Sequence, residues 1–277
     1  GMVTQTVLQR QIPNAYIVPV TINYEKVLEI DKIVHELKGN PKKLESFGGA
    51  VTGGLKILQQ NFGSVKVCFG EAVSLQQSIA DMKAQQGDDS FDPSGNEEDR
   101  RALDRYVALD VVRRLHEEIE ISPTSLVSTL LLESPGGLSW ARITHQVEWL
   151  TEQVSQRGGR LIHSRLCSAE AARKGVNLLG DHVSWSQESK ILSVRKEESV
   201  QVTGPLPPID RTSALMLAYY RNTLSHLFVA EAFGATVVSS FGETAAVEKG
   251  VSPSDGLFTE RMESLRQAFR YEFVGLD

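Results

Sequence analysis

The sequence predicts an α/β unit followed by a mostly α-helical domain that contains a small β-hairpin. Two short runs rich in Val and Ile, at residues 16–22 and 65–69, are bounded by Gly and Pro and separated by helical patterns. Such alternation is typical of α/β layering. Beyond residue 100, apolar residues recur at steps of three and four, which indicates amphipathic helices.

The first unit, residues 1–83, alternates helices and strands. We expect helices at 3–11, about 26–37 and about 44–61, and strands at 16–22 and 65–69. Pro19 lies inside the first strand and has no N–H to donate to a ladder, so it predicts a sheet edge or a bulge there. Two strands are too few for an isolated sheet, so this unit is expected to form part of a larger sheet.

An acidic segment at residues 84–99 separates the two predicted units. It carries six acidic residues, no basic residue and one aromatic residue. Such a composition buries too little apolar surface to order itself. We therefore predict a linker at 84–99 and a helical domain at 100–277.

Helix signals follow one another in the second unit. Ser122 and Pro123 provide an N-cap and a proline at the first helical position, opening a helix to about Glu133. Further helices are expected over 103–119, 143–154, 168–179 and 258–269, with a hairpin over 183–194. A long apolar helix is expected near 211–230. Because apolar residues nearly encircle that helix, Arg221 within it is expected to be buried and paired.

Charge and composition exclude several classes of function. The net charge is −6, and residues 121–200, whose helix and hairpin order imitates a winged helix, carry nine bases and eight acids. The basic face that nucleic acid requires is absent, so no nucleic-acid partner is expected. No apolar run approaches the ~18 residues of a membrane span, and two cysteines suggest a reducing compartment.

The residues form no complete catalytic constellation. None of the six histidines begins a zinc signature, and there is no nucleophile elbow, P-loop or dinucleotide-binding glycine motif, so no metal site is expected. Only His226 has an acidic residue five positions later, which is Glu231. In a helix these side chains point about 140° apart, which favours a structural role over a catalytic one.

Three blocks carry a family resemblance. They are IPNAYIVPVTINYEKVLE (12–29), GNPKKLESFGGAVTGGLKILQQNFGSVKVCFGEAVSL (39–75), and the segment 209–228 centred on Tyr220, Arg221 and Asn222. In this order they resemble the glycerol-3-phosphate and dihydroxyacetone-phosphate acyltransferases, with NFGSVKVCFGEAVSL most similar to the second branch. The resemblance implies the second half of a glycerolipid acyltransferase α/β domain followed by the family's C-terminal helical region.

The resemblance also implies a reaction. The family transfers an acyl group from acyl-CoA, a co-substrate needing no further cofactor, to dihydroxyacetone phosphate or glycerol 3-phosphate. Its catalytic His-x4-Asp pair and its phosphate-binding block do not occur in these 277 residues, so this chain alone is expected to be inactive and soluble. The implied parent enzyme is membrane-associated, peroxisomal or mitochondrial, and makes ether-lipid or glycerolipid precursors. A non-catalytic scaffold protein on a degenerate acyltransferase remnant is the alternative.

Several residues are candidates for substrate contact. The resemblance places the block containing Val18, Pro19 and Tyr24 near the substrate, against the alternative of a merely structural edge strand. Lys42, Lys43 and Ser46 lie at the expected start of a helix, where N–H groups and ammonium groups favour a polyanion. A solvated lysine pair is the alternative there. Arg221 is a further candidate for phosphate contact, against structural pairing.

Overall fold

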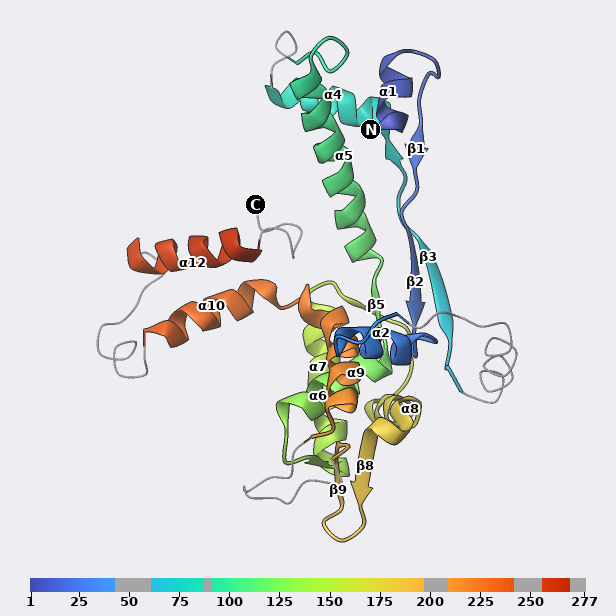
Figure 1. Cartoon of the computed structure of the whole chain (residues 1–277), viewed down its shortest axis with the longest axis vertical. Coiled ribbons are helices and arrows are strands. Elements are labelled where there is room, and N and C mark those ends of the chain that lie inside the picture. Colours follow the sequence, from blue (N-terminus) through green and yellow to red (C-terminus); the bar gives the residue numbers. More distant parts are fainter. Residues whose placement is uncertain (43–60, 87–90, 197–208, 242–255, 270–277) are drawn as a thin grey trace. The chain divides into compact units, whose positions relative to one another are not determined.

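Helices are the main elements in the computed structural model, which describes residues 1–42, 61–86, 91–196, 209–241 and 256–269 (Figure 1). The chain divides into two compact units, and each is built from separate stretches of sequence. The first unit contains residues 1–21, 67–118 and 228–277, and the second contains residues 22–66 and 119–227. None of the helices in the described ranges is both long and apolar enough to cross a membrane.

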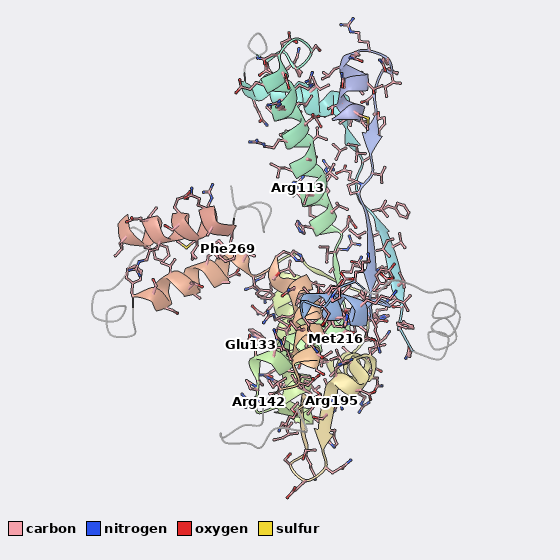
Figure 2. All side chains as sticks on the ribbon, viewed as in Figure 1. Arg113, Glu133, Arg142, Arg195, Met216 and Phe269 are labelled. Atoms are coloured by element: carbon pink, nitrogen blue, oxygen red, sulfur yellow. The ribbon has the colours of Figure 1, made fainter. Side chains whose placement is uncertain are left out.

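The first unit is formed around helices from distant parts of the sequence. Its elements are α1 (Met2–Leu8), β1 (Tyr16–Ile17), β4 (Val73–Ser74), α4 (Leu75–Gln86), α5 (Glu97–Glu117), α10 (Val229–Ser240) and α12 (Gly256–Phe269). β1 pairs antiparallel with β4. The Asn96 side chain caps α5 by accepting from the N–H of Glu98 at 2.9 Å. The ring of Phe269, labelled in Figure 2, lies 5.4 Å from that of Phe233 on α10.

The acidic segment does not separate the two compact units. Phe91 is 2% exposed and packs with Leu75 and Leu103 in one apolar cluster, so α4 and α5 lie in the same unit. The units therefore differ from the sequence-based division at 84–99. The physical reason is that a single aromatic side chain of this segment reaches the core and anchors it.

The Val/Ile-rich strands form a narrow ribbon. β2 (Val20–Tyr24) and β3 (Val65–Phe69) pair in a two-stranded sheet. The strand expected at 16–22 is interrupted at residues 18–19, between β1 and β2, as Pro19 predicts. The Pro19 carbonyl still accepts a hydrogen bond from the N–H of Gly70 at 2.8 Å. Apolar side chains of the ribbon remain exposed, with Val20 at 41% and Phe69 at 70%.

The second unit holds most of the expected helical domain. Its elements are α2 (Ile30–Leu37), β5 (Glu120–Ile121), α6 (Pro123–Glu133), β6 (Leu138–Ser139), α7 (Trp140–Gln156), β7 (Arg160–Leu161), α8 (Ser168–Leu179), the 3₁₀ helix η1 (Gly180–His182), β8 (Val183–Ser186), β9 (Ile191–Val194) and α9 (Arg211–Ser225). β5 pairs parallel with β7. β6, β9 and β8 form a three-stranded antiparallel sheet, which confirms the hairpin expected over 183–194.

Helix α6 is the centre of this unit. It packs against α7, α8 and α9 and is buried on most sides, as an apolar helix should be. Its start is the one predicted, because the Ser122 hydroxyl accepts from the N–H of Ser125 at 3.1 Å and Pro123 opens the helix. Gly175 on α8 allows close approach, since a Cβ there would lie 2.5 Å from the Pro123 carbonyl oxygen.

Two expectations about the apolar C-terminal helix are wrong. The helix expected over 211–230 breaks after Ser225, and α10 begins at Val229, so His226 and Glu231 do not share a helix. Arg221 is exposed rather than buried. Only one face of α9 is buried, and that face includes Met216, labelled in Figure 2, and Tyr220. The helix expected at 44–61 falls on residues that, apart from Asn61, lie outside the described ranges.

Candidate functional site

A buried carboxylate lies directly after strand β2, in the second unit. The Glu25 side chain is fully buried, at 0% exposure. Its backbone is also held on both sides, because its N–H donates to the Ser64 carbonyl at 3.2 Å and its carbonyl accepts from the Thr124 hydroxyl at 2.6 Å. Two segments of the chain thus fix the backbone of Glu25, in addition to the contacts that its side chain makes.

Four donor groups surround the Glu25 carboxylate. Oε2 accepts from the Ser64 N–H at 2.6 Å and from the Ser64 hydroxyl at 2.8 Å. Lys174 Nζ lies 3.0 Å from the same oxygen, and His163 Nε2 lies 2.9 Å from Oε1. A buried charge of this kind is tolerated only when it is paired and hydrogen-bonded, and here it is both.

The surroundings favour the ionised carboxylate. Burial alone would raise the pKa of Glu25, but the hydrogen bonds from Ser64 and Lys174 and the field of His163 outweigh burial and lower this pKa below its ordinary value. The group is therefore a fixed negative charge at neutral pH. We call Glu25, Ser64, His163 and Lys174 the Glu25 cluster.

The Glu25 cluster does not have the geometry of a nucleophilic triad. In such a triad, one ring nitrogen of histidine binds the carboxylate and the other faces the hydroxyl. Here Nε2 of His163 faces each of its partners in the described part of the chain, with Ser64 Oγ at 3.4 Å and Lys174 Nζ at 2.5 Å besides the carboxylate. The Ser64 hydroxyl meanwhile donates to Glu25. The arrangement holds segments together and does not activate a hydroxyl for attack.

A pocket of about 530 Å³ opens beside the cluster. One wall is a face of α8 that carries Arg173, Lys174 and Asn177, and the other wall is the loop before β3, with Asn61 and Ser64. The helical wall follows from spacing, because residues three and four apart share one helix face. This pocket is the candidate ligand site of the second unit.

The loop wall of the pocket depends on a glycine. Gly63 has φ +71, and a Cβ there would lie 2.5 Å from Oε2 of Glu25. Only glycine adopts this backbone without strain and leaves room for the buried carboxylate. The Asn61 side chain holds the turn by accepting from the Gly63 N–H at 2.9 Å.

A second cavity, of about 120 Å³, lies between α9 and the start of α6. Tyr24, one of the residues predicted to contact substrate, lines it together with Tyr220. The Tyr220 hydroxyl accepts from the Val27 N–H at 3.0 Å. Burial raises the pKa of Tyr220 to about 12, so this phenol stays protonated at physiological pH.

The other predicted contact residues are distributed over both units. Val18 and Pro19 belong to the first unit, whereas Tyr24, Lys42 and Arg221 belong to the second. Lys42 and Arg221 are exposed and line neither of the two cavities described above. Lys43 and Ser46 lie outside the described residues. The role of all seven in substrate binding stays a prediction.

Sequence reasoning missed the Glu25 cluster. Glu25 falls within the block that carries the family resemblance, but a single glutamate gives no chemical signal. His163 lies 138 residues away in the sequence, and no short spacing connects the two. Only the packing of the second unit brings these groups together.

Comparison with known proteins gives a consistent result. The family described as "Glycerol-3-phosphate acyltransferase C-terminal region" matches residues 34–277. The chain is 30% identical over 233 residues to the dihydroxyacetone phosphate acyltransferase of Homo sapiens, covering 83% of the chain and 34% of that protein. It is 30% identical over 249 residues to the glycerol-3-phosphate acyltransferase of Actinobacillus pleuropneumoniae serotype 3 (strain JL03), covering 86% of the chain and 28% of that protein. The chain thus spans about a third of the length of the curated relatives it matches.

Proposed function

We propose that this chain works as part of an acyl-CoA-dependent O-acyltransferase. The premise is that the chain belongs to the family of the glycerol-3-phosphate acyltransferase C-terminal region. The acceptor is dihydroxyacetone phosphate or glycerol 3-phosphate. The observation that carries the proposal is the similarity to enzymes of both names over more than four fifths of the chain.

In this proposal the chain supplies binding surface and support rather than the general base. Transfer to an acceptor hydroxyl requires a base within hydrogen-bond reach of the hydroxyl proton. The 277 residues contain no His-x4-Asp pair, and in the Glu25 cluster Nε2 of His163 already faces Glu25, Ser64 and Lys174. The base would come from residues that the longer relatives have in addition to the matched region.

The Glu25 cluster has a positioning role in this proposal. Glu25 directly follows β2, in the block whose family resemblance implies closeness to substrate, and its carboxylate ties that block to α8 through Lys174. Groups that contact substrate must be held to within about 0.5 Å by the residues behind them. A buried, fully hydrogen-bonded carboxylate provides such support.

We assign the acceptor to dihydroxyacetone phosphate within this proposal. Four mammalian relatives named dihydroxyacetone phosphate acyltransferase, at 27–30% identity, support this choice over the bacterial glycerol-3-phosphate acyltransferases. Ether-lipid precursor synthesis and a membrane-associated, peroxisomal or mitochondrial parent enzyme follow as parts of the same proposal.

Acyl transfer assays test the proposal. The purified 277-residue chain and the protein expressed from the complete reading frame are incubated with labelled acyl-CoA and either acceptor. We expect transfer to dihydroxyacetone phosphate by the complete protein and none by the chain. Absence of transfer by a complete protein that contains a His-x4-Asp pair would contradict the proposal and favour the scaffold alternative. Turnover by the chain alone that survives replacement of His226 would contradict the proposed absence of a base.

A further inference from the structure

The pocket beside the Glu25 cluster presents several hydrogen-bond donors. Arg173 is exposed on its α8 wall and, among the described residues, has no carboxylate within ion-pair distance. Its guanidinium lies 6.0 Å from the Trp140 ring centroid, a contact that leaves its N–H groups available. The guanidinium thus supplies a planar set of donors at the mouth of the pocket.

Other donors face the same space. Asn177 lies one turn along α8 from Arg173, and its amide has no hydrogen-bond partner among the residues the structure describes. Lys174 Nζ donates to Glu25 and carries three N–H bonds, so at least one N–H remains for a ligand. The side-chain oxygen Oδ1 of Asn61 accepts from the Gly63 N–H, so the side-chain amide offers its NH₂ group to a ligand.

The acidic residue of the pocket is already engaged. Glu170 lines the same helix face, but its carboxylate accepts from the N–H of Cys167 at 3.0 Å, in the capping box at the start of α8. That hydrogen bond, with others at Cys167 and the nearby Arg173, lowers the pKa of Glu170. Glu25, the other nearby acid, is buried and neutralised by Lys174. The pocket therefore presents donors on Arg173, Asn177 and Asn61 beside the ionised carboxylate of Glu170.

We propose that this pocket, with Arg173, Lys174 and Asn177 on one wall and Asn61 on the other, binds a phosphate ester. Phosphate oxygens accept several charge-assisted hydrogen bonds at once, which suits a guanidinium, an ammonium and two amides. The volume of about 530 Å³ lies within the roughly 300–1,000 Å³ of small-molecule sites. The proposal rests on the proposed function only for its choice of ligands, the phosphates of coenzyme A or those of a glycerol-phosphate-type acceptor.

Calorimetric titration of the 277-residue chain tests the pocket without any acyl transfer. The probes are coenzyme A, dihydroxyacetone phosphate, glycerol 3-phosphate and inorganic phosphate, each at low and at physiological salt. We expect saturable binding of coenzyme A or of the acceptors, and the probe that binds identifies the source of the phosphate. Binding should weaken at higher salt because the contacts are partly exposed.

Two matched variants locate the binding. Arg173→Gln removes the guanidinium from the pocket, and Arg142→Gln removes one from the exposed surface of α7, outside the pocket lining. We expect Arg173→Gln to weaken binding about tenfold or more, since hydrogen bonds to charged groups are worth ~1.5–3 kcal/mol. Arg142→Gln should bind like wild type. Circular dichroism confirms that both variants fold.

The outcomes separate the pocket from the proposed function. The proposed phosphate site would be overturned if no phosphate ester bound, or if both variants bound the phosphate ester equally weakly. In the complete protein, normal acyl transfer with an unchanged KM in Arg173→Gln would also overturn the pocket while leaving the function in place. Arg173-dependent binding in a complete protein that transfers no acyl group would overturn the function and leave the pocket.

Discussion

Lys174 Nζ lies 3.0 Å from Oε2 of Glu25, so a lysine on α8 neutralises a carboxylate that is fully buried at the end of β2. The lysine itself is 32% exposed, and its partner is at 0%. The pair therefore joins a surface helix to a residue inside the second unit. The first two predictions follow from this relationship.

We expect Lys174→Met to destabilise the chain by about 3 kcal/mol, because removal of one partner leaves a buried charge without its counter-ion. Urea denaturation measures this change. The control is Lys32→Met, which breaks a surface pair with Glu29 at 3.7 Å that is more than half exposed on both sides. Such a pair is worth about 0–1 kcal/mol. Equal losses of stability in the two variants would show that the buried Glu25–Lys174 pair contributes no more than a surface ion pair.

The Glu25 carboxylate should make the free energy of unfolding depend on pH in the acidic range. Burial raises its pKa, but the contacts from Ser64, Lys174 and His163 lower the folded-state pKa below the ordinary value of 4.5. Its contribution is therefore complete above pH 4.5 and is lost as pH falls through the folded-state pKa. We expect Glu25→Gln to lose about 2 kcal/mol at pH 7, with the difference from wild type shrinking toward pH 3.

Denaturation curves at a series of pH values test this expectation. Other carboxylates with lowered pKa values, such as Glu120 and Asp210, titrate in the same range, so the informative quantity is the wild-type-minus-variant difference. The exposed Glu148→Gln provides the control for the Glu-to-Gln substitution itself. A Glu25→Gln difference that does not change with pH would argue against an ionised Glu25.

Replacing Tyr220 by Phe should remove a single hydrogen bond with little change in volume. The Val27 N–H then loses its acceptor at 3.0 Å in a region where the ring is 2% exposed. We expect a loss of about 1–2 kcal/mol in the free energy of unfolding. Tyr24→Phe, at a ring that is 45% exposed, should change stability far less. A Tyr220→Phe variant with wild-type stability would mean that the Val27 N–H finds another partner.

Two glycine substitutions should act in opposite directions. Gly175→Ala places a Cβ 2.5 Å from the Pro123 carbonyl oxygen and 2.7 Å from Val127, and should cost about 1–3 kcal/mol by overpacking α6 against α8. Gly234→Ala meets no atom within 4 Å in the middle of α10 and should gain about 0.5–1 kcal/mol through helix propensity. Thermal melts of both variants provide the comparison. A neutral Gly175→Ala would contradict the close helix contact.

Local signals in the sequence predicted the elements they mark. The start of α6 at Pro123 and the hairpin β8–β9 are confirmed, because caps and alternation act over a few residues. Arg221 was misplaced because apolar residues around α9 suggested burial on all sides, whereas the helix buries one face. Phe91 was missed for a similar reason, since composition does not show where one side chain packs.

The candidate site was less predictable than the elements. The family resemblance identified the block that contains Glu25, but its partners Ser64, His163 and Lys174 come from two other regions of the chain. Their meeting depends on the packing of α8 against α6, to which Gly175 contributes. Tertiary packing of this kind leaves no periodic pattern in the sequence.

The interleaved composition of the two units has a consequence for synthesis on the ribosome. Neither unit is contiguous, since the first resumes at residue 67 and again at residue 228. Glu25 leaves the exit tunnel about 150 residues before Lys174, a delay of roughly 7–30 s at translation rates of ~5–20 residues per second. During that interval the nascent chain carries the glutamate without its lysine, and neither unit is completed early. The Glu25 cluster can therefore form only after residue 174 has left the tunnel, and the second unit can close only after residue 227 has done so.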